Sequence, residues 1–206
     1  MSTPNKYLLS IESAVAGGSI ALFENELLFA SRCGDGSVSR AEDLLPNVIS
    51  MLGEAEISKG DISRVAVSLG PGSYTGLRIG IAAVMGLKRG LGIEYVGVPL
   101  FEALAAGVEE AVIAVPMGKA EVCFTKPGDV GSPKVVSIDE FAGFLLSVSS
   151  GRVRIHDALR EPLNDVIGFG IETFGPNLAE FIGRAAMLRP PSRSLEPIYV
   201  QNPRFG

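Results

Sequence analysis

The sequence predicts an α/β protein built from two similar layered units, the second of which is degenerate. Three features support this: short apolar runs joined by tight turns open the chain, helical and strand patterns alternate after them, and the same order begins again near Ala111. A meander followed by alternating helices and strands is typical of architectures in which helices pack on the faces of a sheet. No clear internal repeat accompanies the pattern, so the second unit is inferred from the order of the elements.

Three strands are expected at the start of the chain. The apolar run 7–11 suits a buried strand, and residues 19–23 suggest a second strand after two glycines. Glu24 and Asn25 form the expected two-residue turn, because asparagine tolerates the positive φ that such turns require. Residues 26–31 then pair back as a third strand.

A helix is expected next, because apolar residues recur at spacings of three and four over residues 44–55. Its start stays open. A start near Glu42 or Asp43 puts Pro46 in the first turn, where proline is tolerated, whereas a start at the capping box that begins with Ser39 places this proline inside the helix. After it we expect a strand over 64–69, a helix over 76–91, a strand over 94–98 and a short helix over 99–107.

The second half repeats this order less clearly. Strands are expected over 111–115, 120–125 and 134–137, and helices over 138–148 and 177–188, while residues 189–206 are proline-rich and irregular. We therefore expect an N-terminal unit over residues 1–108 and a shorter, degenerate C-terminal unit over residues 109–206 that ends in the proline-rich tail.

The composition limits the classes of function. The formal net charge is −5 and the sequence pI is about 5.0, whereas a protein that binds nucleic acid by itself is normally basic. Two cysteines and one histidine, His156, cannot build a disulfide scaffold or a tetrahedral zinc site, and we expect that histidine to lie on the surface. The first residues do not form a signal peptide, and no apolar run approaches the ~20 residues of a membrane helix. We expect a cytoplasmic protein with no membrane contact, no metal and no cofactor.

A glycine-rich loop, Gly70-Pro71-Gly72-Ser73-Tyr74-Thr75-Gly76, lies between an expected strand and an expected helix. Backbone N–H groups converge in such a loop and the helix N-terminus adds positive potential, so the arrangement can bind an anion or a phosphate. The candidate binding residues are Gly70, Gly72, Ser73 and Thr75. The alternative is that the glycines only permit a tight turn. The loop matches neither a Walker A motif nor a dinucleotide-binding fingerprint.

The helix after this loop carries a smooth face. On a helical wheel, its small residues share one arc with only two larger ones; the arc contains Gly76, Gly80, Ala82, Ala83, Gly86 and Gly90, together with Ile79 and Leu87. Each glycine costs roughly 1 kcal/mol of helix propensity against alanine, and close packing of another helix recovers that cost. The packing partner is either the 44–55 helix of the same chain or a helix of another subunit.

Residues 68–80, Ser-Leu-Gly-Pro-Gly-Ser-Tyr-Thr-Gly-Leu-Arg-Ile-Gly, closely resemble the signature of the TsaB (YeaZ) family. Leu44-Leu45-Pro46 before the loop, Gly97-Val98-Pro99 after it and the segment 196–200 near the C-terminus also resemble that family. The resemblance is firm over residues 7–106.

The resemblance implies an actin-like ATPase (ASKHA) fold with two βββαβα-type units. It also implies a non-catalytic subunit that pairs with a TsaD-type catalytic subunit, with a TsaE-type ATPase and with itself as a homodimer. That complex transfers a threonylcarbamoyl group to the adenosine next to the anticodon of tRNA, and this subunit is expected to meet tRNA only indirectly. The family pairs through the two helices of the first unit, here residues 42–55 and 76–91. The smooth arc is a physical reason for pairing there, because it lets another helix approach closely. The candidate partner-binding residues are Leu44, Leu45, Val48, Gly76, Gly80, Ala83, Gly86 and Leu87.

The sequence departs from the family at Glu12, where members usually have an aspartate, and at residues 116–118, where they often have Asp-Ala-Arg. An acidic residue at the first position helps to hold the nucleotide's metal in the superfamily, so the longer side chain and the degenerate second half predict weak nucleotide binding or none. The alternative function is a small independent ATPase or kinase of the same superfamily. A peptidase ranks last, because the sequence has neither a histidine pair nor a serine elbow.

Overall fold

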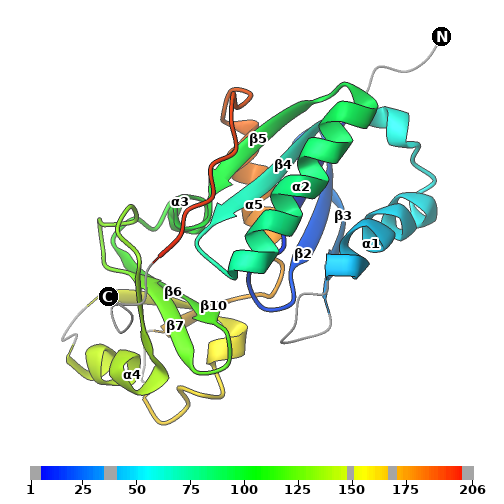
Figure 1. Ribbon diagram of the computed structural model, residues 1–206. Coiled ribbons are helices and arrows are strands. Elements are labelled where there is room, and N and C mark those ends of the chain that lie inside the picture. Colours follow the sequence, from blue (N-terminus) through cyan, green and yellow to red (C-terminus); the bar gives the residue numbers. More distant parts are fainter. Residues whose placement is uncertain (1–5, 35–40, 148–150, 167–170, 201–206) are drawn as a thin grey trace.

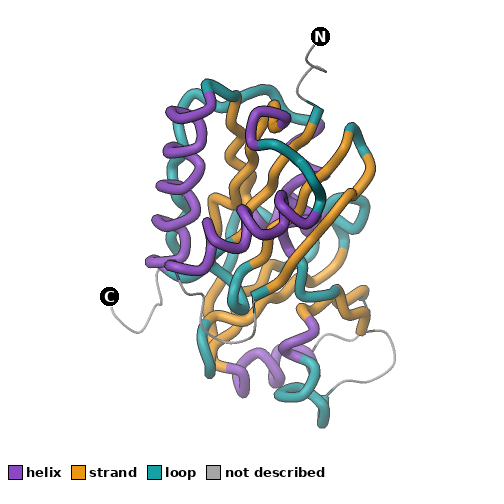
Figure 2. Tube along the Cα trace, turned by 90° about the vertical axis from the view of Figure 1, so that its right-hand side faces the viewer, coloured by secondary structure: helices purple, strands orange, loops and turns teal. Residues whose placement is uncertain are grey.

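The computed structural model describes residues 6–34, 41–147, 151–166 and 171–200. Within these residues the chain forms two five-stranded mixed sheets with helices packed on their faces (Figure 1). Figure 2, turned by 90°, shows the helices (purple) flanking the strands (orange).

The first sheet has the strand order β3-β2-β1-β4-β5. Its strands are β1 (Tyr7–Glu12), β2 (Ser19–Glu24), β3 (Leu27–Cys33), β4 (Ile62–Gly70) and β5 (Glu94–Pro99). The central strand β1 pairs antiparallel with β2 and parallel with β4, and every one of its residues is buried. Burial on both faces explains why this strand is mostly apolar and does not alternate between apolar and polar residues.

The second sheet repeats this topology in the order β10-β9-β6-β7-β8. Its strands are β6 (Ala111–Met117), β7 (Glu121–Thr125), β8 (Lys134–Ser137), β9 (Arg152–His156) and β10 (Ile171–Phe174). As in the first sheet, the central strand β6 pairs antiparallel with the strand that follows it and parallel with the fourth strand of its unit. The expectation of two βββαβα-type units is therefore confirmed.

The helices show where the second unit is degenerate. They are α1 (Ala41–Glu54), α2 (Tyr74–Leu91), α3 (Leu100–Ala105), α4 (Ile138–Ser147) and α5 (Leu178–Met187), with two 3-10 helices, η1 (Lys59–Asp61) and η2 (Asp157–Leu159). Between its fourth and fifth strands the first unit has the 18-residue helix α2, whereas the second unit has only the three-residue η2 among the described residues.

Three apolar clusters form the core and define the layers. Helices α1 and α2 pack on one face of the first sheet, and α4 packs on the outer face of the second. The third cluster joins both sheets through α3 and α5. Although α5 follows the last strand of the second unit, it packs mainly against the first sheet, and Gly183 permits this because a Cβ there would lie 2.2 Å from the Phe23 ring.

Most expected elements are present, with shifted boundaries. Asn25 has the expected positive φ of 56°, but the third strand begins at Leu27, one residue after the expected position. Helix α1 begins at Ala41, so Pro46 lies in its second turn, and the Ser39 capping residue lies outside the described residues. Strands β9 and β10 were not predicted. No helix in the described part of the chain is long and apolar enough to cross a membrane.

Candidate functional site

The glycine-rich loop joins β4 to α2 and packs against the turn between β1 and β2. The Ser73 N–H donates to the Ala14 carbonyl at 2.9 Å, and the Ser13 hydroxyl donates to the Gly76 carbonyl at 2.8 Å. A Cβ at Gly72 would lie 2.5 Å from the Ala14 Cβ, and one at Gly76 would lie 2.2 Å from the Ser13 carbonyl oxygen. These two glycines are therefore required by the close approach of the chain to itself.

Several backbone donors of the loop already have partners inside the protein. The Gly70 N–H donates to the Ser68 hydroxyl at 3.2 Å, and the Gly76 N–H donates to the Ser73 hydroxyl, which caps α2, at 3.3 Å. Gly70 itself has a φ of +94°, which glycine adopts without strain. These contacts favour the tight-turn interpretation of the loop, and anion binding at Gly70, Gly72, Ser73 and the exposed Thr75 stays a prediction.

The acidic residue next to the loop is also held by its own chain. Glu12 is fully buried, and its carboxylate accepts hydrogen bonds from the N–H groups of Ala14 at 2.7 Å and Val15 at 3.2 Å. Burial raises the pKa of this carboxyl to about 7, although the two N–H donors act in the opposite direction. The carboxylate stabilises the turn between β1 and β2, and both of its oxygens already have a protein donor.

The structure divides the predicted partner-binding residues into two groups. Val48, Gly76 and Gly80 are buried within this chain, where a Cβ at Gly80 would lie 2.3 Å from the Ser13 hydroxyl oxygen. The others reach the surface wholly or in part; they are Leu44, Leu45, Ala83, Gly86 and Leu87. Leu44 and Leu87 also pack on the core beneath the two helices.

Two exposed apolar residues form a pair on α1, and only the first was among the candidates. Ile49 lies one helical turn after Leu45, and their side chains are 54% and 45% exposed. On the opposite flank of α1, Ser50 and Glu54 bond to Arg32 of β3. Helix α1 packs beside both β3 and α2. The helical spacing of Leu45 and Ile49 was a signal that could have identified this surface.

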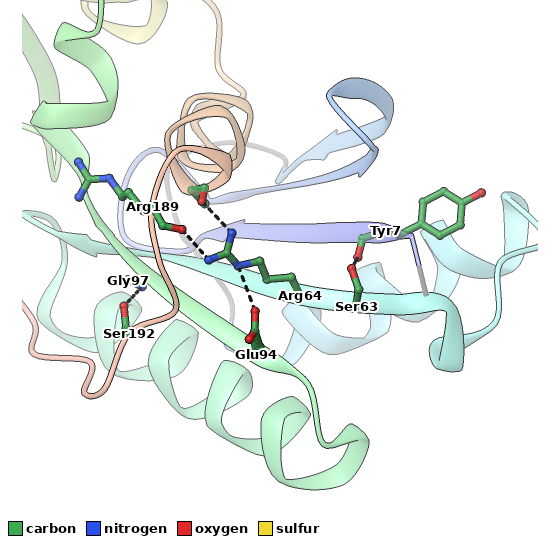
Figure 3. A network of polar contacts seen from close by, with 8 residues as sticks. Tyr7, Ser63, Arg64, Glu94, Gly97, Arg189 and Ser192 are labelled. Atoms are coloured by element: carbon green, nitrogen blue, oxygen red, sulfur yellow. Dashed lines mark hydrogen bonds and ion pairs between the residues drawn. The ribbon is translucent and has the colours of Figure 1, made fainter. Parts of the chain in front are cut away.

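The C-terminal part of the described chain, residues 189–200, lies along the first sheet, and we call it the strap. The Ser192 N–H donates to the Tyr95 carbonyl at 2.8 Å, and the Gly97 N–H donates to the Ser192 hydroxyl at 2.9 Å, so the strap covers the open edge of β5 (Figure 3). Further along, the Ile198 N–H donates to the Leu69 carbonyl at 2.7 Å. This segment was expected only as an irregular tail.

The strap also meets α2. The Tyr199 and Tyr74 rings lie 5.0 Å apart, and the Arg78 guanidinium lies 4.0 Å from the centre of the Tyr74 ring. At the other end of the helix, the Lys88 ammonium lies 4.5 Å from the centre of the Tyr95 ring. The strap therefore runs antiparallel to α2.

The expectation that His156 lies on the surface was wrong. This histidine ends β9 and is only 1% exposed, its Nδ1 accepts a hydrogen bond from the Ala158 N–H at 3.1 Å, and its ring meets Phe174 edge-on. Burial lowers the pKa of the imidazole, although the nearby Asp157 acts in the opposite direction. The described residues contain no group of three or more histidine, cysteine or acidic residues arranged to hold a metal.

Comparisons with known protein sequences give a consistent group of relatives. The family model of TsaD, tRNA N6-adenosine threonylcarbamoyltransferase, matches residues 37–126. The tRNA threonylcarbamoyladenosine biosynthesis proteins TsaB of Bacillus subtilis and Escherichia coli are 31% identical over 99 residues and 33% identical over 102 residues. Each match covers 48% of this chain and 43% of the relative. An uncharacterized protein of Mycobacterium tuberculosis is 39% identical over 66 residues, 32% of this chain and 31% of that protein. The chain thus spans less than half the length of these curated relatives.

Comparisons with solved structures concern the fold. YeaZ from Pseudomonas aeruginosa has a TM-score of 0.64 at 19% identity, and the match covers 95% of this chain and all of YeaZ. The ethanolamine utilization protein EutJ from Carboxydothermus hydrogenoformans has a TM-score of 0.55 at 12% identity, with 91% and 92% of the two chains covered. With the two sheets described above, these neighbours confirm the expected α/β fold, which this chain shares with them over most of its length.

Proposed function

Because its curated relatives and its fold support assignment of this chain to the TsaB (YeaZ) family, we propose that it acts in the synthesis of threonylcarbamoyladenosine in tRNA. The observation that carries this proposal is the sequence match to two TsaB proteins, which extends over about half of the chain. In this proposal the chain is a non-catalytic subunit. It pairs with a TsaD-type catalytic subunit and a TsaE-type ATPase, and it also forms homodimers.

The geometry around Glu12 supports a non-catalytic role. An independent ATPase or kinase, the alternative function, needs an acidic group free to hold the nucleotide's metal. Here that carboxylate is fully buried and bonded to two backbone N–H groups of its own turn. The short η2 in the second unit, where the first unit has α2, adds support, because such a site lies between two complete units.

The proposed pairing surface is the outer side of α1 and α2. Leu45 and Ile49 place exposed apolar area there, and a Cβ at Gly86 would have no heavy atom within 4 Å, so another helix can approach closely. Val48, Gly76 and Gly80 contribute indirectly, because they hold the two helices against the sheet. Burying two large aliphatic side chains stabilises an interface by roughly 3 kcal/mol or more.

Substitutions that place charged side chains on this surface test the proposal. In the double variant Leu45→Glu/Ile49→Glu, both side chains are exposed in the free protein, so we expect the fold to persist while two charges enter the apolar interface. A loss of ~3 kcal/mol weakens association more than a hundredfold. Co-purification with the TsaD-type subunit and sedimentation of the homodimer measure this, with circular dichroism as the check on folding.

The matched control is Leu146→Glu, which charges a side chain of α4 that is 73% exposed on the second unit. We expect this variant to associate like the wild type. If the folded double variant still binds the catalytic subunit at wild-type strength, the pairing surface lies elsewhere.

A further inference from the structure

The cations of α2 and the strap stand out on an acidic protein. The whole chain has a net charge of −5, yet the 18 residues of α2 include three basic residues and no acidic one. Those three, Arg78, Lys88 and Arg89, form no ion pair with any described residue, and neither does Arg193 of the strap. Elsewhere, Arg32, Arg64, Arg152 and Arg189 each pair with a glutamate, whereas Lys119 and Lys134 of the second unit form no ion pair with a described residue.

Two of these cations lie next to aromatic rings. At the N-terminal end of α2, Arg78 packs against Tyr74 and its Nε donates to the Tyr199 hydroxyl at 3.5 Å. The two tyrosines are 53% and 45% exposed, so their rings keep free surface. We call the surface formed by Tyr74, Arg78, Lys88, Arg193 and Tyr199 the basic track.

The track continues to the C-terminal end of α2 and has a defined length. Lys88 lies over the Tyr95 ring, and the Tyr95 hydroxyl donates to the backbone carbonyl of Arg193 at 2.7 Å, so α2 and the strap both contact this residue of β5. Ten residues separate Arg78 from Lys88 on the helix, a rise of about 15 Å. The acidic residues near the track are Glu196 on the strap and Glu94. The Glu94 carboxylate lies 4.0 Å from the Arg64 guanidinium. The local balance is therefore positive.

We propose that the basic track binds the phosphate backbone of an RNA strand, with Tyr199 and Tyr74 stacking against an unpaired base. Unpaired cations that follow a backbone, next to exposed aromatic rings, are the combination by which proteins bind single-stranded nucleic acid. The inference rests on the proposed function for the choice of RNA as the ligand. It also goes beyond the expectation that this subunit meets tRNA only indirectly. The overall negative charge keeps this contact weak, so the chain contributes to RNA binding and the catalytic partner supplies most of the affinity.

The track lies on a different side of α2 from the proposed pairing surface. On the helical wheel, Tyr74, Arg78 and Lys88 fall on the arc opposite to Ala83 and its small neighbours. The same molecule can therefore bind a protein with one side of the helix and an RNA strand with the other. This separation lets the two proposals be tested independently.

The test is fluorescence anisotropy of the full chain with a labelled, unmodified tRNA anticodon stem–loop. Binding should be measurable near 25 mM salt and weaken steeply toward 150 mM, because neutralised phosphates release counterions. In Arg78→Ala/Lys88→Ala, the slope of log affinity against log salt should fall by about 1.4, or 0.7 for each phosphate that is no longer neutralised. The charge-matched control is Lys119→Ala/Lys134→Ala, which removes two exposed lysines of the second unit and should keep the wild-type slope.

Substitutions of Tyr199 distinguish base stacking from non-specific electrostatic attraction as the source of RNA binding. Tyr199→Ala should weaken binding by roughly fivefold or more, whereas Tyr199→Phe, which keeps the ring, should bind nearly as well as the wild type. Poly-glutamate should compete poorly with the RNA.

The proposal is overturned if both double variants reduce the slope equally, if no binding occurs at low salt, or if poly-glutamate competes as well as RNA. The last result would assign the track to an acidic protein segment. Co-purification with the catalytic subunit is measured separately on Arg78→Ala/Lys88→Ala. Retained pairing with weakened RNA binding supports both proposals, while abolished pairing with wild-type RNA binding contradicts both.

Discussion

Glu12 shows how one residue changes the interpretation of a site. Its place at the end of β1 is where the resemblance implies a metal-binding acid, but the structure gives its carboxylate two backbone donors and no exposure to solvent. Sequence alone could not predict this, because a carboxylate at this position can bond either to its own turn or to a ligand. The sequence shows that glutamate stands where family members usually have aspartate. What this replacement does to the site depends on the turn formed by residues 13–18.

The burial of Glu12 predicts a dependence of stability on pH. The pKa of its carboxyl is about 7 in the folded protein against a reference value of 4.5, so the folded state keeps the proton to higher pH than the unfolded state. The free energy of unfolding should therefore fall as the pH rises from about 4.5 to 7 and level off above that, by roughly 3 kcal/mol in total.

The variant Glu12→Gln isolates this effect, because glutamine does not titrate. Urea unfolding of both proteins at several pH values between 4.5 and 8 gives the difference in their free energies of unfolding. We expect that difference to change across this range, since the other carboxylates contribute equally to both proteins. A constant difference would mean that Glu12 is not held in the buried, proton-retaining state.

The glycines of α2 have two distinct roles that a matched pair of substitutions separates. Gly76→Ala places a Cβ 2.2 Å from the Ser13 carbonyl oxygen and should destabilise the protein by about 1–3 kcal/mol. Gly86→Ala meets no heavy atom within 4 Å and should stabilise it by up to about 1 kcal/mol through helix propensity. Thermal unfolding of both variants checks this, and equal effects would contradict the assigned packing of α2.

At the scale of elements, the sequence identifies the small residues that share one arc of α2 but not the neighbours that this arc meets. A helical wheel gives the angle of each side chain and does not show which neighbour occupies that angle. The structure places the N-terminal glycines against the turn after β1 and leaves Gly86 and Gly90 open. The turn after β1 was neither of the two expected packing partners, and the approach of another subunit's helix at the open positions Gly86 and Gly90 stays a prediction.

One residue of β4, Arg64, helps to hold the start of the strap to the first sheet. Arg64 donates from Nη1 to the Ala186 carbonyl at 3.1 Å and from Nη2 to the Arg189 carbonyl at 2.6 Å, so it joins the end of α5 to the start of the strap (Figure 3). Hydrogen bonds that involve a charged group contribute about 1.5–3 kcal/mol.

Arg64→Ala should accordingly lower the free energy of unfolding by about 1.5–3 kcal/mol. The control is Arg152→Ala, whose side chain is 61% exposed and pairs with an exposed Glu172; it should change stability by less than about 1 kcal/mol. Denaturant unfolding measures both. If the two variants are equally stable, Arg64 does not hold the strap.

Strands β9 and β10 were missed for a physical reason. Residues 152–156 alternate charged and apolar side chains, which is a strand signal, but charges at both outward positions made the segment resemble a loop. Strand β10 is only four residues long, with two exposed members. Short strands at the side of a sheet gain their stability from pairing, which local sequence does not report.

At the scale of the whole molecule, the order of elements was enough to predict the two units. Each unit repeats a meander and two parallel strands, so its topology follows from short connections and the handedness of its crossovers. The return of α5 to the first sheet was not predictable from periodicity. It depends on Gly183 meeting Phe23, two residues 160 positions apart in the sequence. The exposed surface of α1 and the basic track likewise appear only when distant segments are brought together.

The central claim is that this chain is a non-catalytic subunit for threonylcarbamoyl transfer to tRNA, and a reconstituted reaction tests it most directly. The TsaD-type and TsaE-type proteins of the same organism are incubated with threonylcarbamoyl-adenylate and unmodified tRNA, with and without this chain, and modified adenosine is measured by mass spectrometry. We predict no product from this chain alone and repeated turnover only when it accompanies both partners. Product formed by the isolated chain, or unchanged turnover by the partners without it, would contradict the account.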